Sequence, residues 1–341
     1  MMKVIPPLVG YTLKGLSQPL EFLASQALFA LPLAPGIQMV RDQAYGAHQQ
    51  QRLDIYYKTP QNRGPLPIVL FIHGGAWING DKSMLHCLCQ RVASQGYLVI
   101  NINYRLAPQY LYQQQIQDIS LAISWAQQKC HDYNGDPQRI FLAGDTAGAN
   151  LALTYAIALG HPYLRNALYL KPSIDLEQLR GIVLIYGAFD LERGVFSYLP
   201  NVSKQFCEIF LGYSNEQLSE WVEVASPLRH LHPNIPPIFI TAGEVDPLFT
   251  QSVLLAQRLR SMDHDYATAF YSKDKHPDGH YLFFNFLRRS FAKEAMDEAC
   301  MFLHFFTEPH GNLKYHREVE NETTLIDHDQ TMEAPERVKS C

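Results

Sequence analysis

The sequence predicts an α/β fold in which a mostly parallel sheet carries helices on both faces and a helical cap or lid. The main observation is that short apolar segments, rich in β-branched and aromatic residues, alternate with segments of helical periodicity. This alternation indicates parallel strands, because each crossover between them requires a helix-sized connection. A second observation is a sharp glycine-rich turn between an apolar segment and a helix near residue 146.

The predicted elements follow one another along most of the chain. The first strand alternates polar and apolar residues, so it is expected to be exposed, whereas the later strands are near-continuous apolar runs typical of buried strands. The predicted strands are 52–57, 67–73, 97–103, 138–144, 181–186, 237–243 and 266–271. Helical spacing is found at 83–94, 115–129, 147–159 and 248–261.

The turn after the strand 138–144 has the form of a nucleophile held between a strand and a helix. Gly144 and Gly148 flank a central Thr146, which fits the pattern Gly-x-nucleophile-x-Gly. The central residue of such a turn has a strained backbone, and flanking side chains larger than glycine would collide with the adjacent strand and helix. Thr146 offers a hydroxyl, but on a β-branched carbon where this pattern usually has serine.

A second glycine-rich segment offers donors for a developing negative charge. The apolar run 67–73 ends in His73, followed by Gly74 and Gly75. Backbone N–H groups at these glycines can approach an oxyanion because no side chain blocks them. The N–H of Ala147, which follows the nucleophile, is a further donor. We therefore predict an oxyanion hole formed by Gly74, Gly75 and Ala147.

An acid and a histidine follow downstream, in the chain order nucleophile, acid, histidine. Asp246 comes just after the strand 237–243, at the edge where an open parallel sheet places its working groups. His280 comes after the last predicted strand and precedes aromatic residues that indicate a buried position. We predict that His280 takes the Thr146 proton and that Asp246 orients and stabilises the imidazole.

Other residues compete for both positions. Glu244 and Asp190 also follow predicted strands, and both rank below Asp246 as the acid. His276 is a second imidazole on the same loop as His280. Asp145, inside the turn, is interpreted as a structural hydrogen-bonding partner rather than as the acid of the triad.

Five motifs in one order resemble the hormone-sensitive-lipase-type esterases of the α/β-hydrolase superfamily, over roughly residues 45 to 307. They are His73-Gly74-Gly75-Ala76-Trp77, Tyr104-Arg105-Leu106-Ala107-Pro108, Gly144-Asp145-Thr146-Ala147-Gly148, Ala225-Ser226-Pro227-Leu228 and Gly243-Glu244-Val245-Asp246. The resemblance implies an α/β-hydrolase fold and a carboxylesterase or lipase that cleaves small to medium acyl esters without a metal or cofactor. Related branches act on amides, formamides and carbamates, so amide or formamide hydrolysis is an alternative.

Two positions depart from the family pattern. The family has serine where this chain has Thr146 and usually has a third glycine where this chain has Ala149. Because β-branching restricts χ1, and a misplacement near 1 Å can cost on the order of 10²-fold in rate, a slow hydrolase is one interpretation. A non-catalytic protein that binds a ligand on the same fold is the other. The retained His280 and Asp246 favour catalysis.

Composition limits the classes of partner. The net charge of −5 over 341 residues gives no basic footprint for nucleic acid. The six cysteines show neither a Cys-x-x-Cys pair nor metal-ligand spacing. This usage predicts a reduced, cytoplasmic environment, with secretion or peripheral membrane association as alternatives. The expected partner is a small-molecule acyl ester, and the oligomeric state is not predicted.

We divide the chain into three regions. Residues 1–44 are predicted to form an N-terminal cap segment, 45–307 the hydrolase domain with a lid insertion at about 194–234, and 308–341 a disordered tail. The apolar part of the first region is too short and too interrupted to span a bilayer, so it is expected to cover the active-site mouth. Contact of this segment with a membrane surface is the alternative.

Overall fold

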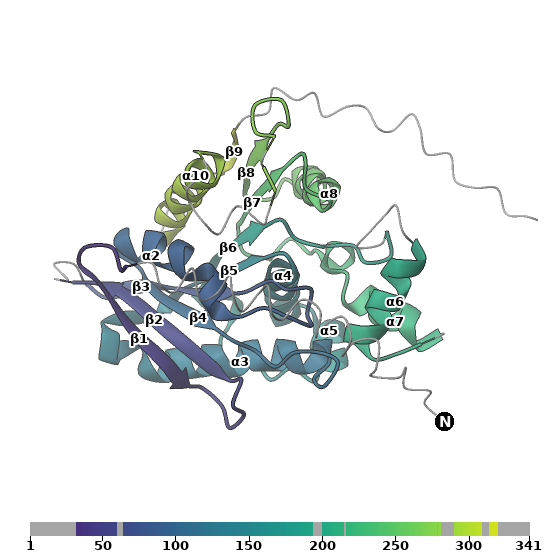
Figure 1. Cartoon of the computed structure of the whole chain (residues 1–341), viewed down its shortest axis with the longest axis horizontal. Helices are drawn as coiled ribbons and strands as arrows, with labels where there is room; N and C mark the ends of the chain where they lie inside the picture. Colours follow the sequence, from purple (N-terminus) through teal and green to yellow (C-terminus); the bar gives the residue numbers. More distant parts are fainter. Residues whose placement is uncertain are drawn as a thin grey trace, which may run out of the picture.

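The computed structural model describes residues 32–59, 64–193, 200–214, 216–277, 279–280, 290–308 and 314–319. These residues form a nine-stranded sheet in the order β1-β2-β4-β3-β5-β6-β7-β8-β9 (Figure 1). The pairs β1–β2 and β2–β4 are antiparallel, and all later pairs are parallel. The prediction of a mostly parallel sheet is confirmed.

The strand bounds lie within a few residues of the predicted ones. The strands are β1 (Ile37–Ala44), β2 (Arg52–Lys58), β3 (Leu66–Ile72), β4 (Leu98–Ile102), β5 (Gly135–Asp145), β6 (Leu179–Ile185), β7 (Ile238–Gly243), β8 (Tyr266–Tyr271) and β9 (His316–Val319). Strands β3, β4, β7 and β8 are buried along their whole length, because helices cover the sheet on both faces.

The helices form two layers around the sheet. They are α2 (His86–Ser94), α3 (Tyr112–Lys129), α4 (Ala147–Gly160), α5 (Pro162–Ala167), α6 (Pro200–Leu211), α7 (Glu216–Val224), α8 (Phe249–Ser261) and α10 (Ser290–Thr307). Helices α2 and α10 contact each other on one face, while α3 and α4 contact each other on the opposite face, where α8 also lies (Figure 1). Helix α4 is buried from Ala147 to Leu159, as its Ala/Leu-rich sequence predicts.

Three expectations about the edges of the sheet need correction. Strand β2 was expected to be exposed, but Leu53–Tyr56 are buried because β1 pairs with its outer edge and α2 packs on it. Strand β1 lies within the predicted cap segment 1–44 and pairs with β2. Strand β9 lies within the tail predicted to be disordered from 308 and pairs with β8. The sheet therefore extends beyond both predicted domain boundaries, while 1–31 and 320–341 lie outside the described residues.

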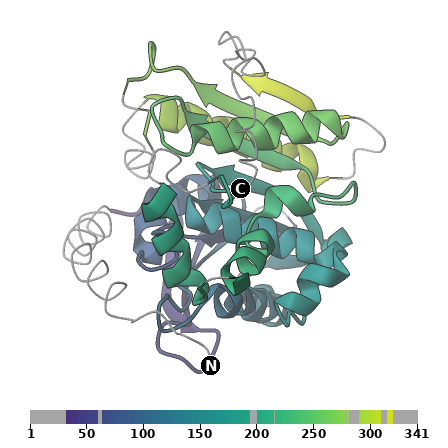
Figure 2. The same ribbon diagram turned by 90° about the vertical axis from the view of Figure 1, so that its right-hand side faces the viewer.

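The insertion predicted at about 194–234 contains α6 and α7, which pack on each other. Figure 2, viewed from the side on which they lie, shows them in front of the sheet. Residues 194–199 and 215 of this region lie outside the described residues. In the parts of the chain that the structure describes, no helix is long and apolar enough to cross a membrane.

The start of α4 is built around glycines that leave no room for a side chain. A Cβ on Gly148 would lie 2.0 Å from the carbonyl oxygen of Ile72 in β3, and one on Gly144 would lie 2.5 Å from the carbonyl oxygen of Gly148. The predicted reason for both glycines is confirmed by these distances.

We expect Gly148→Ala to lower the free energy of unfolding by at least about 2 kcal/mol, since the added methyl collides with strand backbone. Helix propensity alone would raise the free energy of unfolding by about 1 kcal/mol, because alanine favours a helix more than glycine does. Gly64→Ala is the matched control, because nothing lies within 4 Å of its Cβ, and it should change stability by less than about 0.5 kcal/mol. Urea unfolding measures both, and a stabilised Gly148→Ala protein would contradict the packing described here.

Candidate active site

Thr146 occupies the turn between the end of β5 and the start of α4. Its backbone has φ 47° and ψ −111°, and its N–H donates to the carbonyl oxygen of Ile185 at the end of β6 (2.8 Å). A positive φ is rare for a β-branched residue and costs of order 1–3 kcal/mol. The surrounding sheet therefore holds Thr146 in the strained conformation that the sequence predicts for a nucleophile.

The hydroxyl of Thr146 points at the loop that follows β3. A Cβ built on Gly74 would lie only 2.0 Å from Thr146 Oγ1, so the hydroxyl occupies the space that a side chain at residue 74 would fill. Thr146 is 8% exposed, and Ala147 directly after it opens helix α4. The hydroxyl, the loop after β3 and the amino end of α4 thus meet at one place.

The loop after β3 has three successive residues with positive φ: Gly75 at 109°, Ala76 at 55° and Trp77 at 61°. The carbonyl oxygen of Gly75 accepts N–H groups from Ile78 and Asn79 (3.2 and 2.9 Å), which closes the loop into a tight turn. The N–H groups of Gly75 and Ala76 donate to no acceptor among the described residues. They are therefore free to bind an anionic oxygen.

The N–H of Gly74 has a different role, which corrects its assignment as an oxyanion donor. It donates to Oδ1 of Asp145 at 2.7 Å, so it is already used inside the protein. The predicted donors that remain are Gly75 and Ala147, and the N–H of Ala147 likewise donates to no acceptor among the described residues. Ala76 joins them as a donor that the sequence analysis missed, since nothing in its side chain signals the positive φ of its backbone.

Asp145 is a buried carboxyl in direct contact with the loop after β3. Burial raises its pKa to about 7, while the N–H of Gly74 opposes the rise. Its interpretation as a structural partner, not as the acid of the triad, agrees with the hydrogen bond that it makes to Gly74.

The predicted acid and histidine lie near each other. Asp246 is 4% exposed, and its Oδ1 accepts the N–H of Leu248 (2.8 Å). Nε2 of His280 lies 3.9 Å from Oδ2 of Asp246, longer than a hydrogen bond but within reach of a small side-chain movement. The structure thus brings His280 and Asp246 together, whereas the pairing of His280 with the Thr146 hydroxyl stays a prediction.

Backbone packing holds the loop of His280 against the ends of two strands. The carbonyl oxygen of Gly279 accepts the hydroxyl of Tyr186, which follows β6, at 3.4 Å. A Cβ on Gly243, the last residue of β7, would lie 1.9 Å from the same oxygen. Because the N–H of Thr146 is itself hydrogen-bonded to the end of β6, the loop of His280 and the turn of Thr146 lie at adjacent strand ends.

The competing acids and the second histidine have other partners. Asp190 lies 3.3 Å from Nε of Arg229. Glu244 is bonded to the N–H and Nζ of Lys273 (3.0 Å each), and these contacts lower the pKa of Glu244. The ring of His276 packs edge-on against the last residue of β8, with the two centroids 5.2 Å apart. These contacts favour Asp246 and His280 over their rivals.

Tyr104 of the motif Tyr104-Arg105 contacts the start of the loop after β3. The hydroxyl of Tyr104 donates to the carbonyl oxygen of His73 (2.9 Å), and the two rings stack with centroids 4.5 Å apart. Nη2 of Arg105 donates to Oδ1 of the buried Asp118 at 2.7 Å. Asp118 therefore anchors the Arg105 guanidinium.

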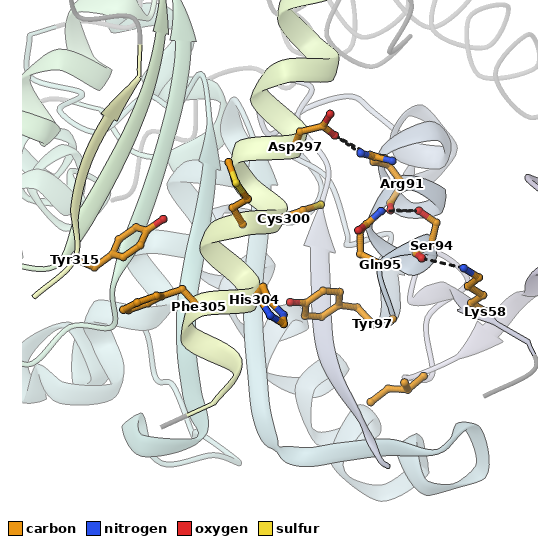
Figure 3. A pocket seen from close by; sticks show the side chains of 13 residues that line it. Lys58, Arg91, Ser94, Gln95, Tyr97, Asp297, Cys300, His304, Phe305 and Tyr315 are labelled. Carbon is orange, nitrogen blue, oxygen red and sulfur yellow. Dashed lines mark hydrogen bonds and ion pairs between the residues drawn. The ribbon is translucent and has the colours of Figure 1, made fainter. Parts of the chain in front are cut away.

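A large hollow elsewhere on the molecule is separate from this site. It has a volume of about 1050 Å³ and lies between α2, α10 and neighbouring strands, with Arg91, Tyr97, Cys300 and Phe305 among its lining residues (Figure 3). None of Thr146, Asp246 and His280 lines it. Within the described ranges, no group of three or more His, Cys, Asp or Glu side chains could hold a metal ion.

Comparisons with known proteins show the family of this chain. The family model described as BD-FAE matches residues 53–259, a range that includes the loop after β3, Thr146 and Asp246. Esterase LipQ of Mycobacterium tuberculosis is 29% identical over 274 residues, covering 77% of this chain and 63% of LipQ. Versiconal hemiacetal acetate esterase of Dothistroma septosporum is 28% identical over 223 residues, covering 60% of this chain and 64% of the relative. The chain thus spans less than two thirds of the length of these relatives.

Solved structures with the same fold are also esterases by name. Esterase B from Lactobacillus rhamnosis superposes with a TM-score of 0.77 at 20% identity, covering 88% of this chain and 96% of that one. Bacterial heroin esterase gives a TM-score of 0.66 at 21% identity, covering 86% of this chain and 91% of the other. At these identities the likeness shows the α/β-hydrolase fold alone.

Asp145→Asn tests the buried carboxyl. With a folded-state pKa of about 7 against an ordinary value of 3.8, folded Asp145 binds its proton more tightly than unfolded Asp145 does. Its stabilising contribution is therefore complete at acidic pH and is lost as the pH rises from about 4 to about 7. Relative to Asp145→Asn, the wild type should lose on the order of 4 kcal/mol of unfolding free energy over this range, at 1.36 kcal/mol per pKa unit. Urea unfolding at several pH values measures the unfolding free energy of both proteins. If the two free energies changed in parallel with pH, the raised pKa of Asp145 would be contradicted.

Proposed function

Because this chain belongs to the BD-FAE family and has the α/β-hydrolase fold, we propose that it hydrolyses carboxylic esters with small to medium acyl groups. One observation carries the proposal. The hydroxyl of Thr146, in a strained turn, faces a loop whose Gly75 and Ala76 N–H groups are free to bind an anionic oxygen. Relatives named as esterases support the same class of reaction.

In the proposed reaction, Oγ1 of Thr146 attacks the ester carbonyl carbon while the imidazole of His280 takes the hydroxyl proton. The carbonyl oxygen becomes an oxyanion and accepts N–H groups from Gly75, Ala76 and Ala147. His280 then gives its proton to the leaving alcohol, and the carbon–oxygen bond to that alcohol breaks. A water molecule, deprotonated by His280, attacks the acyl carbon. The bond from that carbon to Oγ1 of Thr146 then breaks, His280 returns the proton to Oγ1, and the carboxylic acid is released.

Asp246 is proposed to orient His280 by accepting the N–H of the ring nitrogen that faces it, Nε2, and to stabilise the imidazolium. Its side chain is buried with no exposed surface, which strengthens a charge interaction because solvent screens it little. Nε2 of His280 and Oδ2 of Asp246 are 3.9 Å apart, which is longer than a hydrogen bond. Catalytic hydrogen bonds commonly tighten only when substrate is bound.

The methyl group of Thr146 is proposed to make the enzyme slow. The side chain is β-branched, so fewer χ1 values are accessible than for serine, and its backbone is already at φ 47°. The hydroxyl then spends less time in the rotamer that faces both His280 and the ester carbon. The expected consequence is a low kcat with an ordinary KM, because the methyl hinders the attack more than it hinders binding.

We also propose that α6 and α7 form a lid over this site. The supporting contacts run from α6 to the loop after β3, where Phe210 stacks on Trp77 with ring centroids 4.1 Å apart. The insertion therefore rests directly on the residues that follow the oxyanion donors.

Thr146→Ser should raise kcat for short p-nitrophenyl esters by about 10-fold or more, since it removes the methyl and keeps the hydroxyl. Thr146→Ala should lower kcat by at least about 10³-fold. Thr154→Ser is the matched control, because Thr154 is buried on the same helix, where it bonds Tyr112, and kcat should stay within about twofold. If neither wild type nor Thr146→Ser hydrolyses any ester, ligand binding without catalysis becomes the better account.

Asp246→Asn should lower kcat by at least about 10²-fold, because the neutral amide cannot stabilise a charged imidazole. Glu244→Gln, two residues away, should change kcat by less than about twofold, since Glu244 bonds Lys273 at the surface. Steady-state hydrolysis of p-nitrophenyl acetate measures both. If kcat fell more in Glu244→Gln than in Asp246→Asn, Glu244 and not Asp246 would be the acid of the triad.

A further inference from the structure

We infer that Phe210 of α6 is a positioning residue for the oxyanion hole and that it acts through Trp77. This inference rests on the proposed function. It states that the lid controls the geometry of the reacting site through an aromatic stack, in addition to covering it.

The backbone of the loop after β3 is strained. Three residues in sequence have positive φ, and two of them, Ala76 and Trp77, carry side chains that disfavour this region. Such a conformation persists only when surrounding contacts hold it in place. Without those contacts, the backbone would relax and the N–H groups of Gly75 and Ala76 would turn away from their common target.

The contacts that hold the loop converge on Trp77. Its carbonyl oxygen accepts the N–H of Ala107 (3.0 Å) and Nε2 of Gln115 (2.8 Å), which fix its backbone from one side. Its ring lies parallel to that of Phe210, with 4.1 Å between centroids and 9° between planes, and is tilted against Phe206 at 6.2 Å. Both Trp77 and Phe210 are almost fully buried, at 1% and 0% exposed.

The same phenylalanine also reaches the helix that begins at the nucleophile. The ring of Phe210 packs against Tyr112 of α3, with centroids 6.1 Å apart. The hydroxyl of Tyr112 is bonded to Asn150 Oδ1 and Thr154 Oγ1 of α4, both at 2.8 Å. Phe210 is therefore in contact with the loop of the donors and one residue removed from the helix of the nucleophile.

Through these two sets of contacts, the Phe210 ring connects the loop after β3 with helix α4. The free N–H groups at residues 75 and 76 and the hydroxyl of Thr146 belong to different segments of the chain. Phe210 packs against Trp77 on one segment and against the residue that anchors the other. A change in the position of α6 is thereby transmitted to the relative placement of donors and nucleophile, on which the rate depends steeply.

Phe210→Leu tests the inference. Leucine keeps an apolar side chain but cannot stack, so kcat for p-nitrophenyl esters should fall at least about 10-fold while KM changes less than about 3-fold. Phe302→Leu is the matched control, because Phe302 of α10 is also 0% exposed and packs against Phe239 of β7, away from Trp77. It should keep kcat within about twofold. Equal losses of kcat in the two variants would overturn the inference.

A double-mutant cycle tests the route through Trp77. In a Trp77→Leu background the stack is already absent, so Phe210→Leu should lower kcat by less than about twofold more. If Phe210→Leu lowered kcat in the Trp77→Leu background as much as it does in the wild type, Phe210 would act by a route other than Trp77.

Amide hydrogen exchange tests the same point without any turnover. Exchange in peptides covering residues 75–78 should become at least about 10-fold faster in Phe210→Leu than in Phe302→Leu, because the strained loop opens more often. Equal exchange in the two variants would overturn the inference. If the wild type hydrolyses no ester, the proposed function fails, but the exchange comparison still decides whether Phe210 holds the loop.

Discussion

The packing of the turn at Thr146 against the end of β3 is the constraint on which the rest of the site depends. Gly148 touches the carbonyl oxygen of Ile72, and the Thr146 hydroxyl occupies the space beside Gly74, each at a separation that excludes a Cβ. The two glycines let the helix α4, the strand β3 and the following loop approach as closely as backbones allow. In the proposed reaction, this close approach lets the hydroxyl reach the carbonyl carbon of an ester while the N–H groups of the loop bind the oxygen of the same carbonyl.

The hydrogen bonds made by the buried residues around this contact determine which backbone N–H groups remain available to bind a ligand. Asp145 is enclosed, and its carboxyl takes the N–H of Gly74, which fixes the beginning of the loop to the turn. The N–H groups of Gly75, Ala76 and Ala147 are left without acceptors among the described residues, and all three belong to strained backbone or to a helix amino end. Donors that are held apart from internal partners stabilise an oxyanion without reorganisation, which is the usual source of large rate effects. The proposed reaction requires donors of this kind beside the side chain at position 146.

Most of the fold, and the order of the candidate site residues along the chain, could be predicted from local sequence patterns. The remaining features depend on contacts between residues far apart in the sequence. Near-continuous apolar runs predicted β3 to β8 because both faces of those strands are covered, but β1 and β9 are edge strands whose polar residues give no such signal. The glycine pattern predicted the strained turn at Thr146, since only glycine can be enclosed there. It could not show that the N–H of Gly74 is used by Asp145, because that contact joins residues 71 apart. Nor could it predict positive φ at Ala76 and Trp77, because neither residue type favours the left-handed region.

Covalent labelling tests the central claim most directly, because an activated hydroxyl reacts with a fluorophosphonate whereas an ordinary threonine does not. The wild-type protein would be treated with the probe, digested and analysed by mass spectrometry, with heat-denatured protein as the control. The account predicts one phosphonate adduct on Thr146 in the folded protein and none after denaturation. A folded protein that takes up no label at Thr146, or that is labelled elsewhere instead, would contradict it.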